Sequence, residues 1–282
     1  MKTGDKVALV CCSNGQPESH REQLERLGDL LSQMGLIPVF GDYIYQDHSV
    51  FSGSARQRAE SLMNFYKEEE IRAIFDLSGG DLANEILPYL DYSLIAGSDK
   101  SFWGYSDLTT VINAIYAKTG KSSVLYQVRN LVYADAANQI ARFTNMLFYD
   151  KKELYTFSYD WIQKGTMQGI VVGGNIRCLL KLAGTPYWPD MKDKILLLEA
   201  FHGTVPQMVT YLSQLKQMGV FDEVGGILLG TFTEMEEKGC VPSIVDLVIQ
   251  YAGSSVPIAK TGEIGHGEDA KAILIGEKIN LA

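Results

Sequence analysis

The first half of the chain alternates short apolar runs with segments in which apolar residues recur every three or four positions. A short apolar run is typical of a buried strand, and the longer periodic segments are typical of amphipathic helices. Strands are expected at residues 7–12, 36–40, 73–77, 102–105 and 124–126. This alternation predicts a parallel sheet whose faces are covered by helices.

The first periodic segment illustrates the helices of this half. Leucines recur at spacings of three and four from Leu24 to Leu31, which places them on one face of a helix. Gly35 follows this pattern, and a glycine can end a helix in a left-handed conformation. Further helices are expected at residues 55–66 and 108–115.

The second half of the chain is richer in predicted strands. They are expected at residues 169–172, 195–198, 226–229 and 272–275, with one helix among them at 205–218. Between the two halves, residues 134–165 contain a further helix that carries Ile140, Phe143 and Leu147 on one face, followed by a connector at 151–164.

The connector marks the expected domain boundary. We expect an N-terminal α/β domain at residues 1–150, with a parallel sheet of the Rossmann-like or flavodoxin-like kind, and a strand-richer C-terminal α/β domain at residues 165–282. The 282 residues correspond to about two domains of ~150 residues each, and a hydrophobic content of 46% is ample for buried cores.

Composition and charge exclude several classes of protein. Charged residues make up 21% of the chain and no segment is of low complexity, which excludes disordered, collagen-like and coiled-coil proteins. The 25 Lys and Arg residues against 34 Asp and Glu residues give a net charge of −9, which repels phosphate backbones and anionic membrane surfaces. Neither a nucleic acid nor a membrane is therefore an expected partner.

The cysteines and the N-terminal segment indicate a cytoplasmic protein. The apolar run at residues 7–12 is too short for a signal peptide or a membrane span. The four cysteines have no Cys-x-x-Cys spacing, so neither disulfides nor a cysteine-based zinc site is expected. The four histidines form no metal-binding motif, and we expect neither a metal nor a cofactor.

The segment from Gly104 to Asp107 is a candidate site for a nucleophile. It joins a predicted strand to a predicted helix, so the hydroxyl of Ser106 would lie in a sharp turn where the helix amides can stabilise a developing negative charge. Leu108 stands where the Gly-x-Ser-x-Gly motif has its second glycine. Because serine also caps helices, Ser106 could be no more than an N-cap.

Four further residues complete this hypothesis. Gly79 and Gly80 end the preceding strand, where they would form an oxyanion donor, a phosphate cradle or a simple tight turn. Glu199 follows a buried strand, and His266 lies between two glycines on a turn. A nucleophilic serine needs a base and an orienting carboxylate, and these two residues supply one candidate for each. His202 is a rival base.

These same segments resemble a known family. Residues 102–109, the pair Leu198–Glu199 and the triplet Gly265–Gly267 are similar to the three signatures of the LD-carboxypeptidase family of serine peptidases, which includes the microcin C immunity proteins. Further short matches lie at residues 4–8, 58–59, 79–81, 173–175, 219–221 and 225–227, along nearly the whole chain.

The resemblance implies a Ser-His-Glu triad in the cleft between the domains. Ser106 of the N-terminal domain would attack an amide carbonyl, His266 would transfer the proton and Glu199 would orient His266. The backbone amides of Gly80 and Asp107 would then hold the oxyanion.

The resemblance also implies a class of substrate, with alternatives. The leading expectation is removal of a C-terminal residue, such as D-alanine, from a murein-derived peptide. The second is hydrolysis of the amide bond of a peptidyl or aminoacyl nucleotide, and the third is a non-enzymatic binder of small molecules. Candidates for stacking on a nucleotide base are Tyr43, Trp161 and Trp188. The family also suggests a homodimer.

Two departures from the family pattern leave the substrate open. Murein-directed members usually carry an arginine before the glycine pair, where this chain has Leu77–Ser78. The family also tends to have a Gly-Pro after the fifth strand, where this chain has residues 126–129, Tyr-Gln-Val-Arg. Gly79 is a candidate contact to the substrate, and Arg129, Arg177 and Lys260 are candidates for binding its carboxylate or are solvated surface charges.

Overall fold

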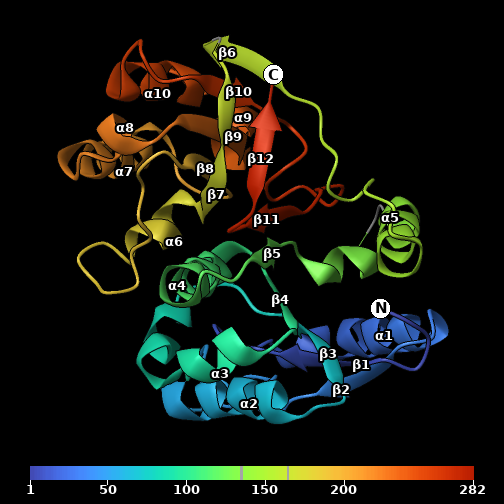
Figure 1. Cartoon of the computed structure of the whole chain (residues 1–282). Helices are drawn as coiled ribbons and strands as arrows, with labels where there is room; N and C mark the ends of the chain where they lie inside the picture. Colours follow the sequence, from blue (N-terminus) through green and yellow to red (C-terminus); the bar gives the residue numbers. More distant parts are fainter. Residues whose placement is uncertain (134–135, 164) are drawn as a thin grey trace.

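Two six-stranded sheets organise the fold (Figure 1). The structure is a computed structural model that describes residues 1–133, 136–163 and 165–282. The chain folds into two mixed α/β domains, as expected from the sequence, and the sheets of both are mainly parallel. Their strand orders are β11-β5-β4-β3-β1-β2 and β12-β7-β8-β9-β10-β6.

The N-terminal sheet is a parallel sheet with one antiparallel strand added at its edge. Its strands are β1 (Lys6–Val10), β2 (Ile37–Phe40), β3 (Ile71–Asp76), β4 (Ser101–Gly104), β5 (Ser123–Leu125) and the antiparallel β11 (Ile273–Ile275). Its helices are η1 (Glu18–His20), α1 (Arg21–Gln33), α2 (Ala55–Lys67), η2 (Ala83–Tyr89), α3 (Tyr92–Gly97), η3 (Ser106–Leu108), α4 (Thr109–Thr119), η4 (Val128–Val132) and α5 (Ala136–Tyr149), where η marks a 3₁₀ helix. The order β2-β1-β3-β4-β5 is that of flavodoxin-like sheets.

The C-terminal sheet has a parallel centre and antiparallel edges. Its strands are β6 (Asp160–Gln163), β7 (Met167–Asn175), β8 (Ile195–Ala200), β9 (Gly226–Phe232), β10 (Ile258–Lys260) and β12 (Lys278–Leu281). Its helices are α6 (Ile176–Leu180), α7 (Val205–Gln217), α8 (Val220–Glu223), α9 (Thr233–Glu237) and α10 (Ile244–Ala252). β6 and β12 run antiparallel to β10 and β7 at the two edges.

The periodic apolar positions of the sequence form the cores of both domains. Leu24, Leu27 and Leu31 of α1 are fully buried, and the helix ends at Gln33, two residues before Gly35, whose φ is +94°. In the second domain Leu212 of α7 and Val248 of α10 share one core with strands β8 and β9. The helix expected within 134–165 is observed as α5, while residues 134, 135 and 164 lie outside the described part of the chain.

Two strands occupy places in the fold that differ from the sequence-based prediction. β6 lies within the expected connector at 151–164, and it pairs with β10 of the C-terminal sheet. β11 was expected among the strands of the second half, but it pairs with β5 of the N-terminal sheet. The domain limits 1–150 and 165–282 stay a prediction.

The two domains meet where α4 packs against the end of β7. The side-chain amide of Asn113 donates to the carbonyl of Gly173 (2.9 Å) and accepts from its N–H (2.8 Å). The N–H of Asn175 donates to Oγ1 of Thr109 (3.0 Å). Since α4 directly follows the candidate nucleophile, these buried bonds fix that residue relative to the second domain.

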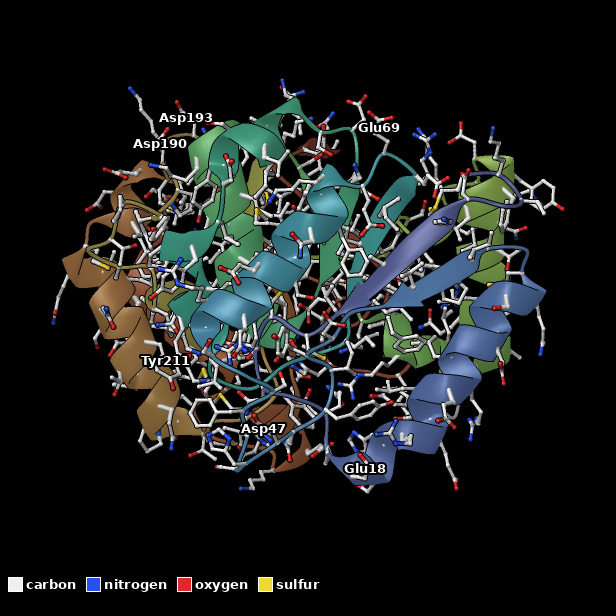
Figure 2. All side chains as sticks on the ribbon, turned by 90° about the horizontal axis from the view of Figure 1, so that it is seen from below. Glu18, Asp47, Glu69, Asp190, Asp193 and Tyr211 are labelled. Atoms are coloured by element: carbon white, nitrogen blue, oxygen red, sulfur yellow. The ribbon has the colours of Figure 1, made fainter. Side chains whose placement is uncertain are left out.

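The negative charge of the protein is spread around its periphery. Figure 2 shows Glu18, Asp47 and Glu69 at different places around the molecule, and Asp190 and Asp193 side by side at another. No helix among residues 1–133, 136–163 and 165–282 is both long and apolar enough to span a membrane.

Candidate active site

Ser106 occupies a strained turn between β4 and α4. Its φ is +54°, a left-handed conformation that non-glycine residues adopt at a cost in free energy. A Cβ atom at Gly104 would lie 2.6 Å from the Cβ of Leu108, so the glycine makes room for Leu108. The absence of a second glycine is therefore compatible with the sharp turn.

A chain of hydrogen bonds links Ser106 to the second domain. Nε2 of His266 lies 3.2 Å from Oγ of Ser106, and Nδ1 of His266 lies 2.6 Å from Oε2 of Glu199. A carboxylate can only accept, so Nδ1 donates to Glu199 and Nε2 is left as the acceptor for the serine hydroxyl. The structure thus brings together three residues that lie 67 and 160 positions apart in the sequence.

The loop after β10 holds the imidazole of His266 in place. Gly265 has a φ of +142°, and a Cβ at this position would lie 1.9 Å from Oγ1 of Thr231. That hydroxyl accepts a hydrogen bond of 3.3 Å from the N–H of His266. The imidazole contacts the rings of Tyr105 and Phe201, with centroid distances of 4.5 and 4.9 Å.

Glu199 is fully buried at the carboxyl end of β8. The register of β8 against β9 shifts between Leu198 and Ala200, and a Cβ at Gly230 would lie 3.1 Å from the Cβ of Glu199. The missing side chain on β9 thus makes room for the carboxylate. Burial raises the pKa of the Tyr105 phenol, and the charge of Glu199 raises it further.

Two backbone amides lie next to Ser106. Gly80 has a φ of +110°, and a Cβ there would overlap the side chain of Asn14, which also accepts from the N–H of Asp81 (3.0 Å). A Cβ at Gly79 would lie 3.8 Å from the Cβ of Ser106, so the glycine loop passes directly beside it. Within the described residues the amides of Gly80 and Asp107 have no hydrogen-bond partner.

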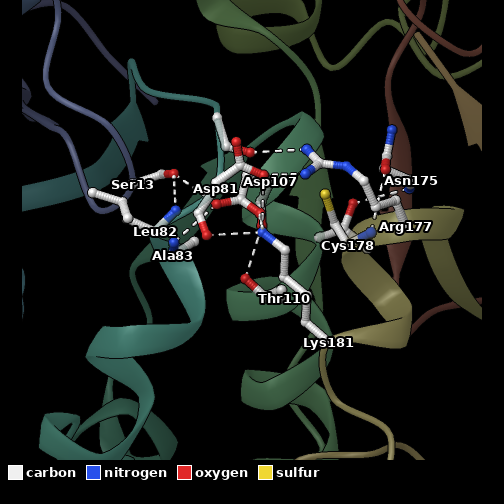
Figure 3. A network of polar contacts seen from close by, with 12 residues as sticks. Ser13, Asp81, Leu82, Ala83, Asp107, Thr110, Asn175, Arg177, Cys178 and Lys181 are labelled. Carbon is white, nitrogen blue, oxygen red and sulfur yellow. Dashed lines mark hydrogen bonds and ion pairs between the residues drawn. The ribbon is translucent and has the colours of Figure 1, made fainter. Parts of the chain in front are cut away.

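The carboxylate of Asp107 ties three other segments to this turn (Figure 3). It is fully buried and accepts from Oγ of Ser13 (2.6 Å), from the N–H of Ala83 (2.9 Å) and from Nζ of Lys181 (2.5 Å). Lys181 follows α6 of the second domain and was not expected to have a role, because a lone lysine after an apolar segment carries no signal.

Ser78, one of the two departures from the family pattern, binds a buried carboxylate. Its hydroxyl donates to Oδ1 of Asp76 (2.5 Å) and accepts from the N–H of Ser13 (2.9 Å). Asp76 also accepts from the N–H of Cys12 (2.8 Å), and burial raises the pKa of this carboxyl. Ser78 therefore serves to hold the ends of β1 and β3 together.

Two cavities flank Ser106. The smaller one, of about 390 Å³, is lined by Ser78, Gly79, Tyr105, Ser106, Gln127, Arg129, Asn130, Tyr133, Phe201, His266, Gly267 and Glu268. The larger one, of about 580 Å³, is lined by Gly80, Asp81, Ser106, Asn175, Arg177, Phe201, His202, Gly203, Gln207, Tyr211 and Glu234. A substrate that extends to both sides of its reacting carbonyl can therefore be accommodated.

Of the three basic residues that were candidates for binding a substrate carboxylate, two line the cavities beside Ser106. Arg129 lines the smaller cavity and Arg177 the larger one. Lys260 instead bonds the carbonyl of Gly230 and the carboxylate of Glu236.

The aromatic residues chosen from the sequence do not line either cavity. Tyr43, Trp161 and Trp188 lie elsewhere, and the aromatic walls are formed by Tyr105, Tyr133, Phe201 and Tyr211. These four residues lie in a turn, two loops and a helix without a shared motif, so no sequence signal selects them.

The alternative general base, His202, is highly exposed, and its Nδ1 lies 3.8 Å from Oε2 of Glu234. No group of three or more His, Cys, Asp or Glu side chains within the described ranges could hold a metal ion.

Comparisons with known proteins match both halves of the chain. The LD-carboxypeptidase N-terminal domain matches residues 7–126, and the LD-carboxypeptidase C-terminal domain matches residues 168–281. A Bacillus subtilis protein named "Probable murein peptide carboxypeptidase" is 27% identical over 288 residues, which cover 99% of this chain and 89% of that protein.

Solved structures match the fold over nearly its whole length. An MccF-like protein from Bacillus anthracis superimposes with a TM-score of 0.88 at 26% identity, covering 99% of this chain and 94% of that one. The microcin C7 self-immunity protein MccF, in complex with aspartyl sulfamoyl adenosine, superimposes with a TM-score of 0.85 at 22% identity. That match covers 100% of this chain and 94% of the other, and it shows the fold alone.

Proposed function

The chain belongs to the LD-carboxypeptidase family, and from this premise we propose that it is a serine-type carboxypeptidase that removes a C-terminal residue, such as D-alanine, from a murein-derived peptide. One observation carries the proposal. His266 lies within hydrogen-bond reach of both Ser106 and the buried Glu199, which is the geometry that a nucleophile, a base and an orienting carboxylate require.

In the proposed reaction, Oγ of Ser106 attacks the carbonyl of the last peptide bond while Nε2 of His266 accepts the hydroxyl proton. Glu199 accepts from Nδ1, which fixes the tautomer and stabilises the imidazolium. The amides of Gly80 and Asp107 donate to the oxyanion. His266 then gives the proton to the leaving amine, and a water molecule activated by the same imidazole hydrolyses the acyl-enzyme.

A peptidyl or aminoacyl nucleotide is the second candidate substrate. Phe201 is 42% exposed and lines the larger cavity together with Tyr211, so an aromatic surface is available for a base to stack on. The solved MccF complex contains aspartyl sulfamoyl adenosine, an aminoacyl nucleotide analogue.

We propose a cytoplasmic location for either reaction, in keeping with four cysteines that are all free thiols.

The proposal is tested with a murein tetrapeptide that ends in D-alanine, incubated with the wild-type protein or with Ser106→Ala. We expect mass spectrometry to detect loss of the terminal residue with the wild-type protein alone. Equal cleavage by both proteins would exclude Ser106 as the nucleophile.

A parallel incubation with an aminoacyl sulfamoyl adenosine separates the two substrates. Cleavage of this compound, with the tetrapeptide left intact, would replace the murein peptide by the nucleotide as substrate. Binding of either compound without turnover would favour the non-enzymatic binder.

A further inference from the structure

Arg129 carries a positive charge that has no ionic partner within the described part of the chain. Its Nη1 donates to Oε1 of Gln16 (3.1 Å), but its Nε is buried and without a hydrogen-bond partner. Nη2, which shares one edge of the guanidinium with Nε, has no partner among the described residues either. A buried donor without a partner is costly, so this open edge is suited to a ligand that supplies acceptors.

The other arginine beside Ser106 is already neutralised. Arg177 forms an ion pair with Asp81, and it holds the pKa of that carboxyl below its usual value. Its Nη2 also donates to the carbonyl of Gly80 (3.0 Å). Arg177 is thus used to hold the glycine loop, and of the two arginines only Arg129 keeps a free edge.

The position of the general acid decides which cavity takes the leaving residue. His266 lines the smaller cavity, whereas Gly80, an oxyanion donor, lines the larger one. Because His266 gives its proton to the leaving nitrogen, the released residue lies on the side of the smaller cavity. In a C-terminal residue the carboxylate is one carbon away from that nitrogen, so it points into the cavity that contains Arg129.

The walls of the smaller cavity hold Arg129 in place. Oε1 of Gln127 accepts from the N–H of Arg129 (3.2 Å), and the ring of Tyr133 lies 5.9 Å from the guanidinium carbon. The carboxylate of Glu268 also lines this cavity, but the residue is exposed and its charge is screened by water. A volume of about 390 Å³ accommodates one small residue.

We propose that Arg129 binds the terminal carboxylate of the residue to be released, and so makes this enzyme a carboxypeptidase. The Nε and Nη2 edge offers two parallel donors, which match the two oxygens of a carboxylate. The side chain of Gln127 accepts from the N–H of Arg129 and so fixes the backbone at this position. The inference rests on the proposed function, because it uses His266 as the general acid.

The test compares two substrates that differ only at the C-terminus: the murein tetrapeptide ending in D-alanine, and the same peptide with a terminal carboxamide. We expect the wild-type protein to prefer the free acid by about 100-fold in kcat/KM. Arg129→Met should lower kcat/KM for the acid about 10- to 100-fold and leave the amide nearly unchanged. Arg129→Lys, which keeps the charge but loses the fork, should retain an intermediate preference.

The matched control is Arg56→Met, which removes the same charge from the exposed face of α2 and should keep the wild-type preference. An acid-to-amide ratio that is unchanged in Arg129→Met would overturn the proposal, even if both rates fall. A general defect in folding lowers both rates together and leaves the ratio at its wild-type value.

A binding experiment separates this inference from the proposed function. Titration calorimetry on Ser106→Ala measures the affinity for both peptides without turnover, and the same titration is made on Ser106→Ala with Arg129→Met. Loss of the preference for the acid in the double variant supports Arg129 even if the wild-type protein cleaves neither peptide. Equal affinities for acid and amide in Ser106→Ala would refute it even if the wild-type protein is an active peptidase.

Discussion

At the scale of single residues, the backbone conformation of Ser106 is strained, which costs free energy of folding. Its φ of +54° is unfavourable for any residue with a Cβ atom. Strain of this kind persists where the surroundings impose it, here the ends of β4 and α4. In the proposed function it presents the hydroxyl to His266.

We therefore expect Ser106→Gly to be more stable than Ser106→Ala by about 1 kcal/mol, because glycine adopts positive φ without strain. Both variants should lack hydrolytic activity. Urea unfolding of the two variants under the same conditions measures the difference. A glycine variant that is the less stable of the two would show that the turn is not strained.

Glu199 offers a second prediction at this scale. Glu199→Gln keeps the shape of the side chain but can place a donor opposite Nδ1 of His266, which favours the wrong tautomer. We expect kcat to fall by roughly 10² to 10⁴-fold with little change in KM. Steady-state kinetics on the tetrapeptide test this, and an unchanged kcat would remove Glu199 from the mechanism.

The sequence could nominate Ser106, Glu199 and His266 because each lies at the end of a predicted strand or in a glycine-rich turn. Their contact could not be predicted from spacing, since the three residues approach one another only when two sheets are packed together. Lys181 and Phe201 were missed for the same reason: a lysine and a phenylalanine acquire a role here only through residues of distant segments.

At the scale of elements, the contact between Lys181 and Asp107 connects α6 of one domain to η3 of the other. The Asp107 side chain is fully buried, while that of Lys181 is 18% exposed. A buried carboxylate that loses its cation is strongly destabilising.

Lys181→Met should therefore lower the free energy of unfolding by about 3 kcal/mol. Lys194→Met is the matched control, because its side chain is 16% exposed but its partner Asp190 is 73% exposed, and it should cost less than about 1 kcal/mol. Denaturant unfolding measures both. Equal losses of unfolding free energy in the two variants would show that the buried pair contributes no more to stability than the exposed pair.

Glu263 holds the segment before β6 to the segment before β11. It pairs with Lys271 (2.8 Å) and accepts from the N–H of Ser158 (2.5 Å), and the Lys271 bond is the largest cause that lowers its pKa from 4.5 to about 2. Because the folded-state pKa is the lower one, the stabilisation is complete above pH 4.5 and is lost as the pH falls towards 2.

We expect Glu263→Gln to cost about 1 kcal/mol at pH 7, since water screens a side chain that is 33% exposed. The difference in Tm from the wild-type protein should shrink between pH 4.5 and 2. Thermal unfolding across this range tests the sign, with Glu237→Gln of α9 as the control. A difference that stays constant with pH would exclude the ionised pair as the cause.

The elements that could be predicted are those with a pattern of their own. All six strands of the N-terminal sheet and the long helices α1, α2 and α7 carry a continuous apolar run or a helical period. β6, β10 and β12 were not predicted from the sequence, and each is defined by the neighbour with which it pairs. β11 was expected as a strand, but the sheet that it joins depends on tertiary packing.

At the scale of the whole molecule, β11 couples the two domains. It comes from the C-terminal half of the chain and covers the edge strand β5 of the N-terminal sheet, as Figure 1 shows. Ile273 and Ile275 are both buried in the core that contains Leu125 of β5. The N-terminal domain is therefore incomplete without residues from the end of the chain.

A fragment of residues 1–150 should accordingly be soluble only at low concentration and should aggregate through its open β5 edge. Co-expression with residues 151–282 should restore a folded complex, whereas the fragment alone should show a broad thermal transition. Light scattering and circular dichroism test this. A monomeric fragment with a sharp transition would show that β11 is dispensable.

The strand β11 also restricts how such a protein can change by recombination. If the N-terminal half of this protein were exchanged for that of a relative, β5 would come from the relative and β11 from this protein. The two strands would then have to pair although they come from different proteins. Chimeras should consequently fold best when residues 271–276 are transplanted together with the N-terminal half. In evolutionary time the two halves are then expected to be inherited as one unit, and this offers a reason why relatives match along the entire chain instead of in one domain.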